Sequence, residues 1–137
     1  MFGMCTADTR PAEGATSFME AMAAAEQTIG KENMLEPKAA KAFLEANKAK
    51  ILFLDVQDPG SESVPGTHSA SLGTLPFKAD AAMADFKDPK IADRPKEDPI
   101  LVTCALGGQA KLAAKLLIDY GFKNVKTVEG GCIAWKA

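Results

Sequence analysis

One cysteine stands where a thiol could do chemistry. Cys104 ends the apolar run of residues 100–104, and the loop that follows it consists of Ala105, Leu106, Gly107, Gly108 and Gln109. The two glycines allow the backbone to curl so that successive N–H groups converge into an anion-binding nest. A helix expected after the loop points the positive end of its dipole at the same place, which favours the nucleophilic thiolate. The spacing therefore predicts an activated nucleophile, and a buried structural thiol is the alternative.

Short apolar runs and helical patterns alternate along the rest of the chain. Residues 51–56 and 100–104 are apolar and rich in β-formers, which predicts strands buried on both faces. Further strands are expected at residues 33–35, 71–77 and 125–128. Helices are expected at residues 37–48 and 79–86 and after the Gly107–Gly108 pair, where Gly121 ends the helix; residues 88–99 are expected to be mostly an irregular connection, and a last turn is expected around Trp135. This alternation predicts an α/β fold with a doubly wound, mostly parallel five-stranded sheet and helices on both faces.

An extra helix is expected before the sheet. Ser17 and Glu20 have the spacing of a capping box, and Gly30 offers a stop. The apolar residues between them recur at helical intervals: Phe18, Met22, Ala25 and Ile29. We expect this stripe to make core contacts rather than a cofactor site. Residues 1–32 would then form an arm and a helix, and residues 33–137 the main domain.

Composition and charge narrow the function classes. The 137 residues fit one domain, and 16 basic against 18 acidic residues give a net charge of −2, with no basic stripe for nucleic acid. The three cysteines, Cys5, Cys104 and Cys132, lack CxxC spacing, so neither a metal nor a cofactor is expected. No apolar run has the length of a membrane span, and the N-terminus is a poor secretory signal. These features favour a cytoplasmic protein without a membrane partner.

Several residues from Cys104 onward have a spacing typical of one family. They are Cys104, Gly107, Leu116, Gly121, Phe122, Val125, Val128, Gly130, Gly131 and Trp135. This order resembles the rhodanese-like family, which has an apolar strand, Cys-x-x-Gly-x-Arg, a Leu-rich helix, a Gly-Phe/Tyr turn and Val-x-x-Leu-x-Gly-Gly-x-x-x-Trp. Residues 51–56 further resemble the family's strand ending in Asp-Val-Arg, with Asp55 in the aspartate position. The resemblance covers about residues 33–137.

The resemblance implies a sulfurtransferase. Cys104 would take sulfur from a donor (thiosulfate, mercaptopyruvate or a protein persulfide), hold it as a persulfide, and pass it to cyanide or a thiol acceptor. The loop from Cys104 to Gln109 has the six-residue length of the sulfur-handling members. Relatives that act on phosphate or arsenate have one residue more and keep an arginine, which argues against a phosphatase. A monomer or weak dimer is expected.

Two arginines of the family pattern are missing. Gln109 and Gln57 stand in their places, and neutral hydrogen bonds are about half as strong as charge-assisted ones. Lys111 or Lys78 could compensate, although each also fits a solvated lysine. We therefore predict that the thiosulfate dianion is a poor donor and that a less charged donor or a protein persulfide is preferred. The same loss favours an alternative, a non-catalytic rhodanese-fold module that carries persulfide or binds a partner.

Four other side chains complete the set of candidates. Cys132 either resolves the Cys104 persulfide through a disulfide or is a small buried residue. Asp55 is expected to organise the loop after its strand through hydrogen bonds. His68, the single histidine, is expected to be structural rather than a catalytic base. Trp135 is expected in the core or the pocket wall.

Overall fold

A parallel sheet forms the centre of the protein. The structure, a computed structural model, describes residues 17–137, and within them one five-stranded, all-parallel sheet has the order β1-β5-β4-β2-β3. Its strands are β1 (Met34–Leu35), β2 (Leu52–Asp55), β3 (His68–Ser69), β4 (Ile100–Thr103) and β5 (Val125–Val128). The central strand, β4, pairs with β2 and β5. The predicted five-stranded parallel sheet is confirmed.

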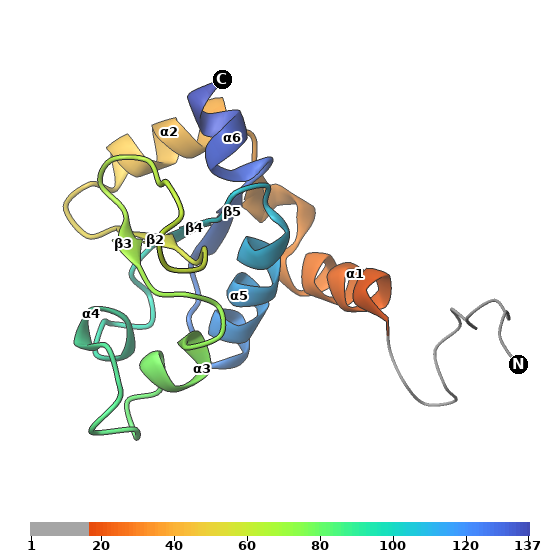
Figure 1. Ribbon diagram of the computed structural model, residues 1–137. Helices are drawn as coiled ribbons and strands as arrows, with labels where there is room; N and C mark the ends of the chain where they lie inside the picture. The colour runs from red at the N-terminus through yellow and green to blue at the C-terminus, as the bar shows by residue number, and fades with distance from the viewer. Residues whose placement is uncertain (1–16) are drawn as a thin grey trace, which may run out of the picture.

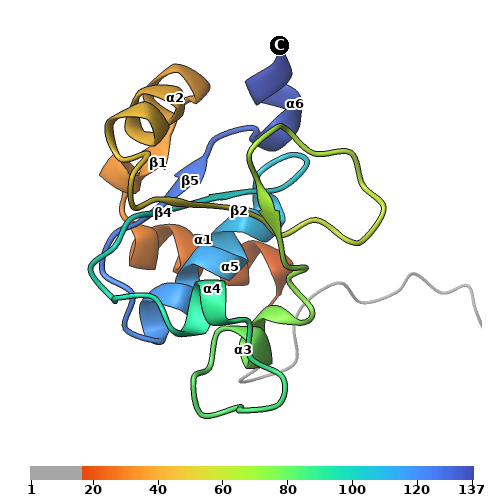
Figure 2. The same cartoon turned by 90° about the vertical axis from the view of Figure 1, so that its left-hand side faces the viewer.

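Helices cover both faces of this sheet, as Figures 1 and 2 show. One face carries α1 (Phe18–Ile29), α3 (Leu75–Lys78), α4 (Pro89–Ala92) and α5 (Gly108–Asp119), and the other carries α2 (Pro37–Ala46) and α6 (Gly131–Lys136). A short 3₁₀ turn, Lys31–Asn33, links α1 to β1. The arrangement confirms the doubly wound fold. No helix within residues 17–137 combines the length and the apolar character that crossing a membrane requires.

Strands β2 and β4 are buried along their whole length because both of their faces are covered. Leu54 and Val102 pack in the layer under α1 and α5. Phe53 and Leu101 point the other way, into the layer under α2 and α6. Burying each such side chain stabilises the fold by roughly 1.5–3 kcal/mol. Two apolar layers therefore hold the strand whose carboxyl end carries Cys104.

Two elements predicted between β2 and β4 are wrong. The segment 71–77, predicted as a strand, contains the start of α3, and the edge strand β3 is only two residues long and lies before it. Pro76 stands in the first turn of α3, where its fixed φ suits a helix. Residues 79–86, predicted as a helix, form turns. A helix, α4, instead begins in the predicted connection, because the Asp88 carboxylate accepts a hydrogen bond from the Lys90 N–H at 3.0 Å.

Helix α1 has the predicted ends. The Ser17 side chain accepts a hydrogen bond from the Glu20 N–H at 3.2 Å, and Gly30, with φ 86°, closes the helix. Its C-terminal half makes the predicted core contacts through Ala25 and Ile29, which are buried. The helix lies beside α5 in both views (Figures 1 and 2).

The predicted core contact is wrong for the first residue of α1. Phe18 is 64% exposed, because the N-terminal end of α1 is the end that lies away from the sheet (Figure 1). Met22, one turn further along, is half-buried. The apolar stripe therefore leaves the core at its N-terminal end.

Candidate functional site

Cys104 directly follows β4 at the carboxyl edge of the sheet, where open parallel sheets bind their ligands. Its side chain is 2% exposed. The sulfur Sγ accepts hydrogen bonds from the N–H of Gly107 at 3.0 Å and from the N–H of Ala110 at 3.4 Å. Helix α5 begins at Gly108 and adds the positive end of its dipole. Two N–H donors and a helix N-terminus thus surround the sulfur, an arrangement that stabilises negative charge on it.

The shape of the loop depends on one of its two glycines. Gly107 has φ 109°, and a Cβ atom there would lie 3.3 Å from the backbone nitrogen of Gly130. Gly108 has open space around it, so it does not meet the same constraint. Of the two glycines predicted to let the loop curl, only Gly107 is therefore required by the backbone conformation.

A second constraint comes from the start of α6. Gly131 has φ 63°, and a Cβ atom there would lie 2.3 Å from the Cys104 carbonyl oxygen and 2.6 Å from that of Ala105. This close approach lets the Cys132 N–H donate to the Cys104 carbonyl at 2.7 Å and the Ile133 N–H to that of Ala105 at 3.2 Å. Helix α6 therefore holds Cys104 and the start of the loop after it in place through backbone hydrogen bonds.

An apolar pocket of about 270 Å³ opens at Cys104. It is lined by Phe18, Cys104, Ala105, Leu106, Gly108, Gln109 and Leu112. Among residues 17–137, no charged side chain lines it. Phe18 comes from α1 and Leu112 from α5, so both helices contribute to the lining together with the loop. We call this the Cys104 pocket.

Three contributors to this site were not among the residues predicted from the sequence. The N–H of Ala110 donates to Sγ. This contact could have been predicted, because Ala110 lies at the expected start of the helix, where N–H groups have no partner within the helix. Phe18 and Leu112 line the Cys104 pocket. Helical spacing predicted only that Phe18 lies on an apolar stripe and did not single out Leu112, because periodicity does not show where one helix ends against another.

Lys111 is neither solvated nor free to bind an anion. Its Nζ lies 2.7 Å from Glu26 Oε2 and 3.2 Å from Glu129 Oε1, and its side chain is 14% exposed. Burial opposes the charge of Lys111, but the two carboxylates outweigh that effect and raise its pKa. The predicted solvated lysine is therefore wrong, because these ion pairs tie α5 to α1 and to the segment after β5.

Asp55, Gln57 and Lys78 line a different hollow, of about 250 Å³, at the carboxyl ends of β2 and β3. Asp55 is buried, and its two oxygens accept hydrogen bonds from Gln57: from the backbone N–H at 3.0 Å and from Nε2 at 2.9 Å. This bonding fits the loop-organising role predicted for Asp55. Cys104 is not part of the lining, so the structure does not bring Gln57 or Lys78 to the Cys104 pocket.

The backbone of Cys132 is hydrogen-bonded to the backbone of Cys104, but the two side chains pack on different faces of the sheet. Its Sγ lies 3.6 Å from Thr103 Oγ1 and 3.7 Å from Gln57 Nε2. Cys132 packs in the layer under α2 and α6, whereas Cys104 packs in the layer under α1 and α5. Cys5 lies outside the described residues.

Two further candidates have structural surroundings. The Trp135 ring packs against Phe53, with 5.1 Å between ring centroids, so it is a partly buried residue at the edge of the core layer under α2 and α6. The Nε2 atom of His68 lies 2.5 Å from Asp88 Oδ2, which links β3 to the start of α4. Neither Trp135 nor His68 lines the Cys104 pocket.

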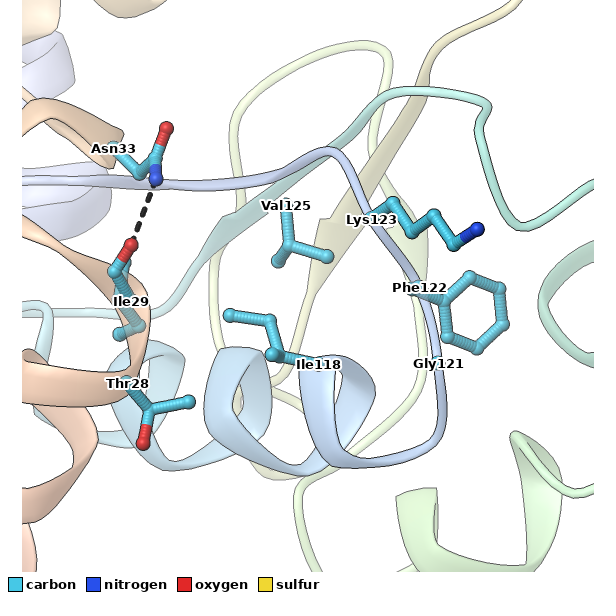
Figure 3. Close-up of a pocket in the computed structure, with 8 residues that line it drawn as sticks. All are labelled: Thr28, Ile29, Asn33, Ile118, Gly121, Phe122, Lys123 and Val125. Carbon is cyan, nitrogen blue, oxygen red and sulfur yellow. Dashed lines mark hydrogen bonds between the residues drawn. The ribbon is translucent and has the colours of Figure 1, made fainter.

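A larger hollow, about 390 Å³, lies at the other end of α5 (Figure 3). Ile118 and Val125 point toward one another at its centre, and α1 contributes Thr28 and Ile29. None of its lining residues is a cysteine, a histidine or a carboxylate. The larger volume therefore does not make it the better candidate for covalent chemistry.

Comparison with known proteins identifies the family of the chain. The family model of the rhodanese-like domain matches residues 36–137. The chain belongs to the rhodanese-like domain family. This rhodanese-like domain is 30% identical over 94 residues to the thiosulfate sulfurtransferase GlpE of Pseudoalteromonas translucida, which covers 66% of the chain and 78% of that relative. It is also 30% identical over 101 residues to GlpE of Vibrio cholerae, with 74% and 85% covered.

Solved structures share the rhodanese-like fold. A protein of unknown function from Rhodopseudomonas palustris, described as a possible tyrosine phosphatase, has a TM-score of 0.78 and 27% identity, and the match covers 98% of this chain and 95% of that one. The human single-domain sulfurtransferase TSTD1 has a TM-score of 0.63 and 15% identity, covering 76% and 95%. The first match extends over α1, which lies before the residues that the family model matches.

Proposed function

We propose that this rhodanese-like domain is a sulfurtransferase that carries sulfane sulfur as a persulfide on Cys104. The observation that carries the proposal is the pair of N–H groups, from Gly107 and Ala110, that converge on Sγ at the N-terminus of α5. Such donors stabilise an anionic sulfur before the transfer and after it. The names of the GlpE relatives, thiosulfate sulfurtransferases, support the same reaction class.

The reaction has two balanced steps. The Cys104 thiolate attacks the outer sulfur of the donor, and with thiosulfate the donor's S–S bond breaks while sulfite leaves with the electron pair. The persulfide anion that remains is then attacked at its outer sulfur by cyanide or a thiolate. The persulfide S–S bond breaks, the Cys104 thiolate is restored, and the product is thiocyanate or a new persulfide.

The charges around the site favour a donor with little negative charge. Within residues 17–137, Arg94 is the only arginine, and its Nη1 donates to the Lys50 carbonyl at 2.8 Å, beyond the amino ends of β2 and β4. The cation nearest in sequence to the loop, Lys111, is paired with two carboxylates. A thiosulfate dianion would therefore rely on backbone N–H groups, whereas a singly charged donor or a protein persulfide would cost less desolvation.

Intact mass spectrometry tests the proposal. Reduced protein is incubated with thiosulfate or, separately, 3-mercaptopyruvate, and cyanide is added afterward. We expect a gain of one sulfur atom that cyanide removes and that the Cys104→Ser variant does not show. Cys132→Ser is the matched control and should still load. If neither donor adds sulfur, the protein is better described as a non-catalytic module of the same fold.

A phosphatase is a second candidate because the Rhodopseudomonas palustris protein is described as a possible tyrosine phosphatase. Binding a phosphate dianion beside a thiolate calls for a cation, and no charged side chain among residues 17–137 lines the Cys104 pocket. We therefore expect no turnover of a generic aryl phosphate. Hydrolysis that depends on Cys104 would favour the phosphatase instead.

A further inference from the structure

Helix α1 contributes to the Cys104 pocket although it lies outside residues 36–137, which the family model matches. Its first residue, Phe18, lines the pocket together with Cys104 and Leu112. Phe18 remains 64% exposed, so a large part of its surface is not used by the fold. The neighbouring Met19 is also exposed, at 73%, but does not line the pocket.

We propose that Phe18 is a specificity-determining residue, the wall that contacts the apolar organic group of a sulfane-sulfur donor. This inference rests on the proposed sulfur transfer through Cys104 and adds the class of donor. The donor is an organic thiosulfonate-like compound, with one negative charge on the sulfur end and an aryl or branched alkyl group at the other.

The lining of the pocket supports an apolar occupant. Its side chains are aliphatic or aromatic apart from Gln109 and the Cys104 thiol, and none of them is charged. Leu106 adds a second exposed apolar surface, at 71%. An apolar group that covers Phe18 and Leu106 removes their surface from water, whereas a small inorganic dianion leaves it exposed. A volume of about 270 Å³ is at the small end for ligand sites and suits a group the size of one aromatic ring.

The helix that carries Phe18 is anchored before any donor binds. Ala25 and Ile29 anchor α1 in the core, and Glu26 pairs with Lys111 of α5 at 2.7 Å. Phe18 therefore stands on an anchored helix. A preformed wall requires less ordering when the donor binds, which increases its contribution to specificity.

The loading step remains balanced with such a donor. The Cys104 thiolate attacks the terminal sulfur of a thiosulfonate anion and forms a new S–S bond. The bond between that sulfur and the sulfonyl sulfur breaks, and a sulfinate anion leaves with the electron pair. The total charge is unchanged, and the organic group departs with the sulfinate. The apolar group therefore contacts Phe18 during the attack and is absent from the persulfide.

Two donors with the same reacting end separate the apolar contact from intrinsic reactivity. Benzenethiosulfonate and methanethiosulfonate carry the same charge but differ in the size of their apolar group. The rate of persulfide formation is measured for each, as a function of donor concentration, by intact mass spectrometry. The proteins compared are wild type, Phe18→Ala, Phe18→Leu and the matched control Met19→Ala. Circular dichroism checks that each variant is folded.

We expect Phe18→Ala to lower the loading efficiency with benzenethiosulfonate about tenfold, mainly by raising the half-saturating concentration. Methanethiosulfonate should change less than about twofold, and Phe18→Leu should recover part of the loss. Met19→Ala should match wild type with both donors. An equal effect of Phe18→Ala on the two donors, or an equal loss in Met19→Ala, would overturn the inference while leaving the sulfur transfer intact. Failure of wild type to load from any donor would overturn the proposed function and this inference with it.

Discussion

The carbonyl oxygen of Cys104 lies 2.3 Å from the position that a Cβ atom of residue 131 would occupy, so the backbone of Gly131 is in direct contact with the start of the Cys104 loop. This contact leaves no room for a side chain at position 131, which is a stronger reason for a glycine there than its positive φ of 63°. It also places the first turn of α6 against the end of β4, where the Cys132 N–H bonds the Cys104 carbonyl. The conformation of the Cys104 loop therefore depends on α6, which comes after α5 and β5 in the sequence.

Replacing Gly131 by alanine should destabilise the protein. The left-handed φ alone costs about 1–2 kcal/mol for an L-residue, and the added methyl group must push the loop away. We expect urea denaturation to show a free energy of unfolding lower by roughly 2–4 kcal/mol. Gly108→Ala is the control, because it has open space and begins a helix, and it should change stability by less than about 1 kcal/mol. Equal stability of the two variants would contradict the close contact.

Adding a cation beside Cys104 should improve thiosulfate as a donor. Gln109 lines the Cys104 pocket, and Gln109→Arg would place a guanidinium where the doubly charged donor must bind. We expect kcat/KM for thiosulfate to rise about tenfold in a coupled cyanide assay, which corresponds to about 1.4 kcal/mol. Gln27→Arg, on the exposed side of α1, adds the same charge away from the pocket and should leave the rate unchanged. No gain in Gln109→Arg would count against the electrostatic explanation of donor choice.

Removing the charge of Lys111 should loosen α1 from α5. Lys111→Met keeps the aliphatic stem but leaves Glu26 and Glu129 without their partner, so we expect stability to fall by roughly 1–2 kcal/mol. Lys115→Met is the control: its pair with Asp119 is exposed and should contribute less than about 0.5 kcal/mol. Thermal unfolding followed by circular dichroism measures both.

The pH dependence of this difference has a defined sign. The pKa of Lys111 is raised above its ordinary value of 10.5, so the folded state binds the proton more tightly than the unfolded state. The contribution of Lys111 is therefore fully present below about pH 10.5 and declines as the pH rises through the folded-state pKa. The stability gap between wild type and Lys111→Met should stay constant from pH 6 to pH 9. A gap that closes within that range would show that Lys111 is not held as described.

Mild peroxide should not join Cys104 to Cys132. The two side chains pack in different layers, and Cys132 Sγ contacts Thr103 and Gln57 instead. Peptide mapping without reductant, in a Cys5→Ala background, should find the two thiols unlinked. The same oxidation of unfolded protein is the control, because the thiols then meet freely. A linked peptide from the folded protein would restore Cys132 as a resolving cysteine.

Much of the central sheet could be predicted from the sequence because strands buried on both faces have an unmistakable composition. The apolar runs before Asp55 and Cys104 gave strands within one or two residues of their ends, and residues 125–128 gave β5 with the observed bounds. The edge could not be predicted in the same way. A two-residue strand such as β3 is too short to show a periodicity. The apolar residues that follow β3 belong instead to α3, which Pro76 favours from its first turn.

The position of Cys104 and its loop between a strand and a helix could be predicted, because an apolar run ends at Cys104 and helical spacing follows the two glycines. The surroundings of Lys111 and Phe18 could not, because they depend on how α1 lies along α5. Each residue fitted its own local pattern, a surface lysine in one case and an apolar stripe in the other. In the structure, Lys111 forms an ion pair with Glu26, and Phe18 lines the Cys104 pocket. Contacts between elements distant in the sequence decided both.

Cys104 is 2% exposed, and under the proposed function we expect this burial to matter when sulfur is added. The outer atom of a persulfide lies about 2 Å beyond Sγ, and we expect it to extend into the Cys104 pocket. The unloaded protein would then offer little to bulky oxidants or thiol-modifying reagents, while the loaded protein would present its cargo at the opening. An acceptor protein that touches only the surface could therefore distinguish a full carrier from an empty one.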